Sequence, residues 1–315
     1  MIRKTLATIL ALCLFPLALF ACAQPQTDNR PTIVTTVFPQ YDFVRQIAGD
    51  TVNLIMLVPV GGESHSYEPT PRDMAAVEEC DLFIEIGGPS EQWAAELRSS
   101  EASEVRVLSL IELEGITLTY ADDSGHEHSL EHVRDFSHSH EIDEHIWLSP
   151  RNAAIMVEAI CDRLCTILPE CADLYRTNTD RYLTELDQLD ARFTSIAANS
   201  TRQTLIFGDR FPFRYLTEAY GLTAYAAYPG CSAEGEPATA TVAALIERVK
   251  AEQIPVVFTI EFSRGEIADT ICAETGAKRL ELHSCHNLSI ADFDAGITYL
   301  DLMHRNADVL EQALN

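Results

Sequence analysis

The sequence predicts an α/β protein with two lobes, each with a mainly parallel sheet flanked by helices, joined by a long bracing helix. Short β-branched or apolar runs alternate with helix-compatible stretches or loops in two separate blocks of the chain. Such alternation is typical of parallel sheets that are covered by helices. A long helical pattern lies between the two blocks, so we expect two α/β lobes and a brace.

The expected strands fall into two groups. Those of the first block are Thr32–Val37, Val52–Val58 and Asp81–Ile86, and those of the second block are Thr204–Phe207, Thr223–Tyr228, Val256–Ile260 and Lys278–Leu282. Each run of the first block is followed by a loop or a helix-compatible stretch, which favours parallel pairing over hairpins.

The helical region between the blocks has clear start and stop signals. Ser149 followed by Pro150 is typical of an N-cap and a first helical position. Pro169 interrupts this region and restarts it. An apolar helix face then follows at spacings of three and four residues: Tyr182, Leu186, Leu189, Phe193 and Ile196. A helix from Glu170 to Asn199 would run roughly 45 Å and reach both lobes.

The first residues of the chain indicate export. Arg3 and Lys4 precede an apolar run that ends in Ala21 and Cys22, a pattern that resembles a bacterial lipoprotein signal. We expect a signal peptide over 1–21 and a lipid on Cys22. The alternative is ordinary secretion with Cys22 unmodified. The expected parts after it are a tether over 22–30, a first lobe over 31–150, the brace over 151–199 and a second lobe over 200–315.

Charge and cysteine usage narrow the function. The chain has 48 acidic against 22 basic residues and a formal net charge of −26, which repels nucleic acid and attracts cations. Seven cysteines follow Cys22. This odd number indicates either that the cysteines have different roles or that the organism does not oxidise its surface proteins. They are Cys80, Cys161, Cys165, Cys171, Cys231, Cys272 and Cys285. No CxxC pair occurs, so a thiolate zinc knuckle is not expected.

One segment, 121–144, is unusually rich in histidine and acidic residues. Its five histidines are His126, His128, His132, His138 and His140. The segment has no sustained apolar period, so we expect a mobile loop that collects metal weakly. The alternative is a solvated insertion with no role.

Two short motifs carry the chemistry. Residues 61–71 contain the string G-x-x-x-H-x-Y-E-P-T-P, and residues 143–150 contain D-x-H-x-W-L-x-P. Both strings resemble signatures of the zinc and manganese receptors of ABC transporters, and the resemblance extends over the chain that follows the signal. It implies the metal-receptor class of periplasmic-binding-protein-like folds, with His65 and His145 as metal ligands.

The resemblance leaves the other two ligands open. The family's third ligand, His or Glu, follows a strand at the start of the second lobe, where this chain has Asp209, which could instead pair with Arg210. The family's fourth ligand is an Asp after the last strand. By spacing, His283 matches that position first and His286 second, with Glu261 in reserve.

The expected donors favour zinc. Three imidazoles suit Zn²⁺, whereas Mn²⁺ prefers more carboxylate, and Ca²⁺ and Mg²⁺ prefer oxygen. The resemblance implies a monomeric extracytoplasmic receptor, held at the membrane by its lipid, that delivers zinc to an ABC permease and its ATPase and is not an enzyme. Two other classes stay open. One is a zinc-dependent hydrolase with Glu68 or Glu261 as general base, and the other is a surface adhesin.

Overall fold

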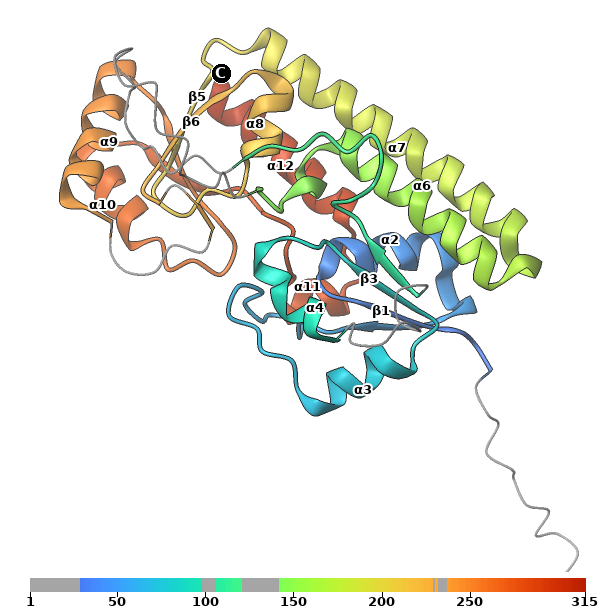
Figure 1. Ribbon diagram of the computed structural model, residues 1–315. Helices are drawn as coiled ribbons and strands as arrows, with labels where there is room; N and C mark the ends of the chain where they lie inside the picture. The colour runs from blue at the N-terminus through green and yellow to red at the C-terminus, as the bar shows by residue number, and fades with distance from the viewer. Residues whose placement is uncertain (1–28, 98–105, 121–141, 229, 232–236) are drawn as a thin grey trace, which may run out of the picture. The chain divides into compact units, whose positions relative to one another are not determined.

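The computed structural model describes residues 29–97, 106–120, 142–228, 230–231 and 237–315 (Figure 1). The chain divides into a short unit, Met1–Arg30, and a compact unit, Pro31–Asn315. The expected signal peptide, Cys22 and the five loop histidines from His126 to His140 lie outside the described residues. Within the described part of the chain, no helix combines the length and apolarity needed to cross a membrane.

The first sheet has four parallel strands in the order β2-β1-β3-β4. The strands are β1 (Thr32–Thr35), β2 (Asn53–Met56), β3 (Leu82–Glu85) and β4 (Val107–Ser109). Ile33 of β1 pairs with Leu54 on one side and with Leu82 on the other. The three expected strands are confirmed with shorter bounds. The sequence did not reveal β4, because three residues carry too little pattern.

The second sheet repeats this topology with the order β6-β5-β7-β8, again all parallel. Its strands are β5 (Thr204–Phe207), β6 (Thr223–Ala226), β7 (Val256–Thr259) and β8 (Lys278–Glu281). All four expected strands are confirmed. Every residue of β7 is buried, as expected for a central strand whose two faces are both covered by helices.

The helices cover the sheets and connect them (Figure 1). They are α2 (Phe38–Ala48), α3 (Pro71–Glu79), α4 (Gln92–Leu97), α6 (Pro150–Ile167), α7 (Ala172–Asn199), α8 (Arg214–Tyr220), α9 (Thr239–Glu252), α10 (Glu266–Thr275), α11 (Ile290–Asp294) and α12 (Tyr299–Leu314). Short 3₁₀ turns include η4 (Ile146–Leu148) and η5 (Pro169–Cys171).

The predicted start and interruption of the central helices are confirmed. The Ser149 side chain caps α6 by accepting a hydrogen bond from the Asn152 N–H, and Pro150 is the first helical residue. A proline lacks the N–H that a continuing helix needs, so the chain breaks at Pro169 into the η5 turn. The α7 helix begins directly afterwards and runs antiparallel to α6.

Helix α7 contacts both lobes, as expected of a brace. Its predicted apolar face is buried along its length. Near its start, Asn178 donates a hydrogen bond to the Ile47 carbonyl of α2 in the first lobe. Towards its end, the Phe193 ring stacks on Tyr220 of α8 in the second lobe, with centroids 5.2 Å apart. Helices α6, α7 and α12 thereby share one continuous core with parts of both sheets.

This topology determines where a ligand can bind. In parallel sheets, all loops that follow the strands emerge at the same edge, and ligands bind there. The loops after β2, β6, β7 and β8 carry His65, Cys231, Glu261 and His286. These side chains therefore follow the carboxyl ends of strands in both sheets.

Candidate metal centre

Four metal-binding side chains converge between the loops: His65, His145, Cys231 and His286. Each offers one donor atom, and the four donor atoms all lie within 4.8 Å of one another. The ring centroids of His145 and His286 are 4.6 Å apart, and those of His65 and His286 are 4.9 Å apart. One ion of ordinary size can therefore contact all four after small side-chain adjustments.

His65 comes from the turn after β2. Gly61 has φ +78 there, a backbone angle that favours glycine. The His65 Nδ1 atom lies 3.5 Å from Glu144 Oε1. The Nε2 atom is buried and has no hydrogen-bond partner among the described residues. A buried polar nitrogen without a partner is costly, and a metal ion would satisfy it.

His145 lies directly before η4 and is held by Asp143. Asp143 Oδ1 accepts the backbone N–H of His145 at 3.0 Å and lies 2.6 Å from its Nδ1. Burial disfavours the charged ring, but Asp143 and Cys231 outweigh it and raise the pKa of His145 well above its ordinary value. Its Nε2, like that of His65, is buried without a partner among the residues described.

Cys231 follows β6 and is buried. Burial would raise the pKa of its thiol, but interactions with His145 and His65 overcome this effect and lower it. The thiolate is the form that binds metal. The backbone of Cys231 is also held, because Arg210 donates a hydrogen bond from Nη1 to its carbonyl at 3.3 Å.

His286 comes from the buried segment after β8. Its Nδ1 lies 2.9 Å from Ser284 Oγ, and its ring meets Trp147 edge-on at 4.9 Å between centroids. Burial, and the charges of His145 and His65, lower the pKa of His286 well below its ordinary value. The ring is therefore kept neutral, as a metal-binding imidazole must be.

The structure brings together three of the five residues that the sequence nominated. His65, His145 and His286 are in the cluster, whereas His283 and Asp209 are not. Of the two histidines that follow β8, the one that the sequence placed second lies in the cluster. His283 Nδ1 instead accepts a hydrogen bond from the Cys285 N–H at 3.0 Å. The Asp209 carboxylate accepts hydrogen bonds from the backbone N–H groups of Arg210 and Ile260.

Cys231 is the member of the cluster that the sequence analysis missed. The absence of a CxxC pair argued against thiolate ligands, but a single cysteine can complete a histidine site. Its position was the available signal, because it follows the carboxyl end of β6 as His286 follows that of β8. The other six cysteines among the described residues are also free, so no disulfide competes for Cys231 there.

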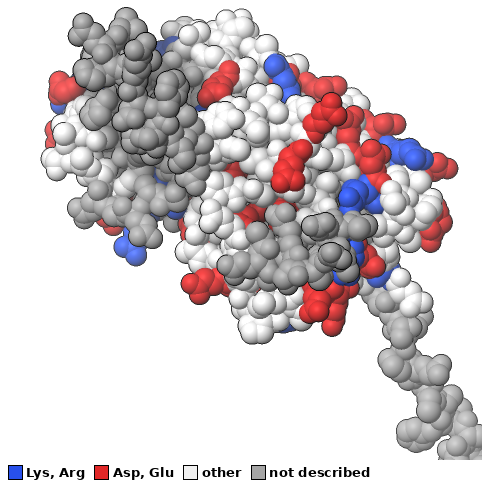
Figure 2. All heavy atoms as spheres, viewed as in Figure 1, with Lys and Arg blue, Asp and Glu red and all other residues white. Residues whose placement is uncertain are grey.

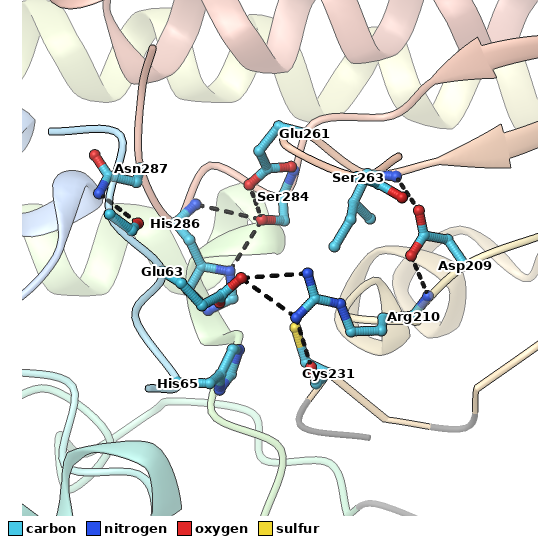
Figure 3. Close-up of polar contacts among 12 residues, drawn as sticks. Glu63, His65, Asp209, Arg210, Cys231, Glu261, Ser263, Ser284, His286 and Asn287 are labelled. Carbon is cyan, nitrogen blue, oxygen red and sulfur yellow. Dashed lines mark hydrogen bonds and ion pairs between the residues drawn. The ribbon is translucent and has the colours of Figure 1, made fainter. Parts of the chain in front are cut away.

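An ion pair between Glu63 and Arg210 lies beside the cluster (Figure 3). Arg210 Nη2 lies 3.3 Å from Glu63 Oε2, two residues before His65. These two residues line a small pocket together with Cys231, His286, Glu261 and Phe262. Two members of the cluster, Cys231 and His286, therefore lie in the wall of this pocket.

The donor set fits zinc. Three imidazoles and one thiolate make a four-donor site of the kind that Zn²⁺ adopts in tetrahedral geometry, provided that His65 and His145 lose their added proton when the ion binds. Thiolate and imidazole are poor ligands for Ca²⁺ and Mg²⁺, and Mn²⁺ prefers carboxylates. The buried Nε2 atoms of His65 and His145 have no hydrogen-bond partner among the described residues, so both are available to bind an ion.

Comparison with known proteins agrees with this donor chemistry. Residues 33–313 match the family described as "Zinc-uptake complex component A periplasmic". The chain is 31% identical over 311 residues to a zinc-binding lipoprotein, AdcA, of Streptococcus pneumoniae, a match that covers 98% of this chain and 61% of AdcA. It is 30% identical to the high-affinity zinc uptake system protein ZnuA of Bacillus subtilis, over 90% of this chain and 87% of that protein.

Solved structures show the same fold. The metal-dependent lipoprotein YcdH of B. subtilis superposes with a TM-score of 0.74 at 28% identity, over 90% of this chain and 99% of that one. The Zn(II)-bound ZnuA-like domain of S. pneumoniae AdcA gives 0.73 at 28% identity, with the same coverage of both chains. The chain spans less than two thirds of the full AdcA relatives. From its two lobes, its donor cluster and these matches, the chain belongs to the zinc-uptake component A family.

Proposed function

We propose that this protein is an extracytoplasmic receptor that binds one Zn²⁺ through His65, His145, Cys231 and His286. The observation that supports this proposal most strongly is the convergence of four donor atoms within 4.8 Å of one another. Zinc is the cargo of this site. The four donors come from loops that are far apart in the sequence, so only the folded chain presents them together.

The thiolate makes the preference for zinc stronger than three histidines alone would. Sulfur is a soft donor that suits Zn²⁺ and disfavours Mn²⁺. We therefore expect the protein to select zinc over manganese. Cys231 is central to this selection, since the other three donors are imidazoles, which several transition metals accept.

The donors belong to both lobes, which suggests how the ion is released. His65 and His145 lie in the first lobe, whereas Cys231 and His286 follow strands of the second. Moving the lobes apart would remove two of the four donors at once. In our proposal an ABC permease and its ATPase receive the ion in this way, and a lipid on Cys22 keeps the receptor at the membrane.

The surface charge supports a role in cation capture. Acidic residues outnumber basic residues by 48 to 22 in the chain. Figure 2 shows acidic side chains scattered over the face in view, with fewer basic ones between them. A surface with this excess raises the local concentration of cations and speeds their association.

The two rival functions have less support. A catalytic zinc site has three protein ligands and an open position for water, whereas this cluster offers four protein donors. An adhesin has no supporting observation of its own. The resemblance to the laminin-binding protein Lbp of Streptococcus pyogenes, at 23% identity, concerns the fold alone.

Metal analysis of the purified protein tests the proposal. Native mass spectrometry after loading with equal amounts of Zn²⁺ and Mn²⁺ should detect one zinc per chain and no manganese. Replacing all four donors by alanine should abolish tight zinc binding and leave only the weak binding expected of segment 121–144. A matched control replaces His283, Asp209, His304 and Cys272, and should bind zinc normally. One tightly bound zinc per chain in the first variant, or none in the control, would contradict the proposed ligands.

A further inference from the structure

We infer that Ser284 and Glu261 together orient His286, so that its Nε2 atom faces the metal. This inference rests on the proposed function, because it concerns the same site. Neither residue contacts the ion in this scheme. Both act through the His286 ring, and they are therefore positioning residues.

A continuous chain of contacts links the three residues (Figure 3). Ser284 donates its backbone N–H to Glu261 Oε2 at 2.7 Å, and its hydroxyl forms a short contact with Glu261 Oε1. The same hydroxyl oxygen lies 2.9 Å from His286 Nδ1. All three side chains are buried, so water does not compete strongly for these contacts.

The direction of each hydrogen bond follows from the chemistry of the groups. An ionised carboxylate can only accept, so the single hydroxyl proton of Ser284 is donated to Glu261. The Ser284 oxygen is then left as an acceptor for His286. His286 must consequently carry its proton on Nδ1, and the lone pair on Nε2 is free for zinc.

The backbone makes this arrangement possible. Cys285 has φ +62, an uncommon angle for a residue other than glycine, and it turns the chain so that Ser284 and His286 lie close together. Trp147 fixes the turn from the other side, because its Nε1–H donates to the Ser284 carbonyl at 2.8 Å. The strained residue therefore lies beside a proposed ligand, where strain is often found.

His283 does not compete for Glu261. Its Nδ1 lies 3.9 Å from Glu261 Oε2, close enough to be read as an ion pair. That Nδ1 already accepts the Cys285 N–H, so it has no proton to offer. The carboxylate of Glu261 is thus available to Ser284, and its effect passes to His286.

The other two histidines of the cluster are also positioned by carboxylates, but through direct contacts. Asp143 contacts His145 Nδ1 directly at 2.6 Å, and Glu144 lies 3.5 Å from His65 Nδ1. Carboxylates behind ligand histidines orient the ring and make it a better donor, and removing them typically weakens metal binding 10- to 100-fold. At His286 the carboxylate acts through a hydroxyl, so both residues are needed.

Two substitutions test the inference. Ser284→Ala removes the relay, and we expect zinc affinity to fall about 10- to 100-fold. Glu261→Gln keeps the shape but adds an NH₂ group that donates to the Ser284 oxygen. The hydroxyl proton then turns towards His286 Nδ1 and favours a proton on Nε2, which blocks the metal. Nitrogen-15 NMR of the histidine rings should detect this change of tautomer in the metal-free protein.

Controls separate positioning from general damage. Ser284→Thr keeps the hydroxyl and should restore the affinity. Ser289→Ala removes a half-buried hydroxyl that caps α11 by accepting the Asp292 N–H. It should lower the melting temperature slightly and leave zinc affinity unchanged. If Glu261→Gln changes neither the zinc affinity nor the tautomer of His286, the inference is overturned. This test holds even if Ser284→Ala fails to fold.

The inference and the proposed function fail in different ways. If His286→Ala binds zinc as tightly as the unaltered chain, His286 is not a ligand and the proposed site is incorrect. If His286→Ala weakens binding but the Ser284 and Glu261 variants do not, only the positioning role is lost. Zinc bound to His286 through Nδ1 would also contradict the positioning role alone.

Discussion

Replacing His286 by alanine should remove most of the zinc-dependent stability, whereas replacing His283 should not. Both histidines follow β8, but only His286 has its ring in the donor cluster. A zinc site with four donors typically contributes about 10–16 kcal/mol. One donor then contributes about 3 kcal/mol, which corresponds to about a hundredfold change in Kd.

This loss translates into a measurable shift of melting temperature. At a free zinc concentration of about 1,000 times the Kd, binding stabilises the folded chain by about 4.1 kcal/mol. A hundredfold weaker site at the same zinc concentration retains only about 1.4 kcal/mol. With roughly 2 °C for each kcal/mol, the zinc-induced rise should fall from about 8 °C to about 3 °C.

Differential scanning calorimetry with buffered zinc is the appropriate assay, with each variant compared with its own metal-free sample. Quenching of Trp147 gives a second signal, since that ring lies 4.9 Å from His286. His283→Ala should keep the full zinc-induced rise, because its Nδ1 is engaged by the Cys285 N–H. A full rise in His286→Ala, with its loss in His283→Ala, would refute the assignment of the donor.

Three further predictions concern other parts of the structure. Cys231→Ser should lose the sulfur-to-metal absorption band of the cobalt-loaded protein and bind Cd²⁺ far more weakly; an unchanged band would exclude the thiolate as a ligand. Glu91 accepts hydrogen bonds from the N–H groups of Ile86 and Gly87, and burial raises its pKa from 4.5 to about 7. The folded state therefore binds the proton more tightly than the unfolded state. As a result, the free energy of unfolding of the metal-free protein should fall by about 3 kcal/mol as pH rises from about 4.5 through 7. This decline should be absent in Glu91→Gln. Phe193→Ala should cost about 3–5 kcal/mol in urea unfolding, because the ring is buried against both lobes' shared core; a loss below about 1 kcal/mol would mean that α7 is not a brace.

The strands and central helices could be predicted from local patterns alone. Runs such as Val256–Ile260 are buried on both faces and therefore consist almost entirely of apolar and β-branched residues. The cap at Ser149 and the break at Pro169 depend only on neighbouring residues, so they are also visible in the sequence. The short strand β4 was missed because its three residues have no periodicity.

The two histidines of the motifs could also be predicted from the sequence. His65 and His145 each lie at a position where the chain ends one element and begins another, and the strings around them are distinctive. The third histidine was found only as a second choice. Spacing from a strand estimates how far along a loop a residue lies, but not in which direction its side chain points.

By itself, the sequence determined two α/β lobes, a helical brace, a preference for zinc and the motif histidines His65 and His145. Tertiary structure alone decided that Cys231 and His286 lie beside them in one cluster. Cys231 and His286 lie far apart in the sequence, and no local pattern links them. The Cys231 thiol reaches the cluster because parallel strands bring their carboxyl ends to one edge of the sheet. His286 lies in the cluster and His283 does not, and between them Cys285 has a positive φ that changes the direction of the chain. Both effects are set by the packing of distant segments, which no pattern of neighbouring residues records.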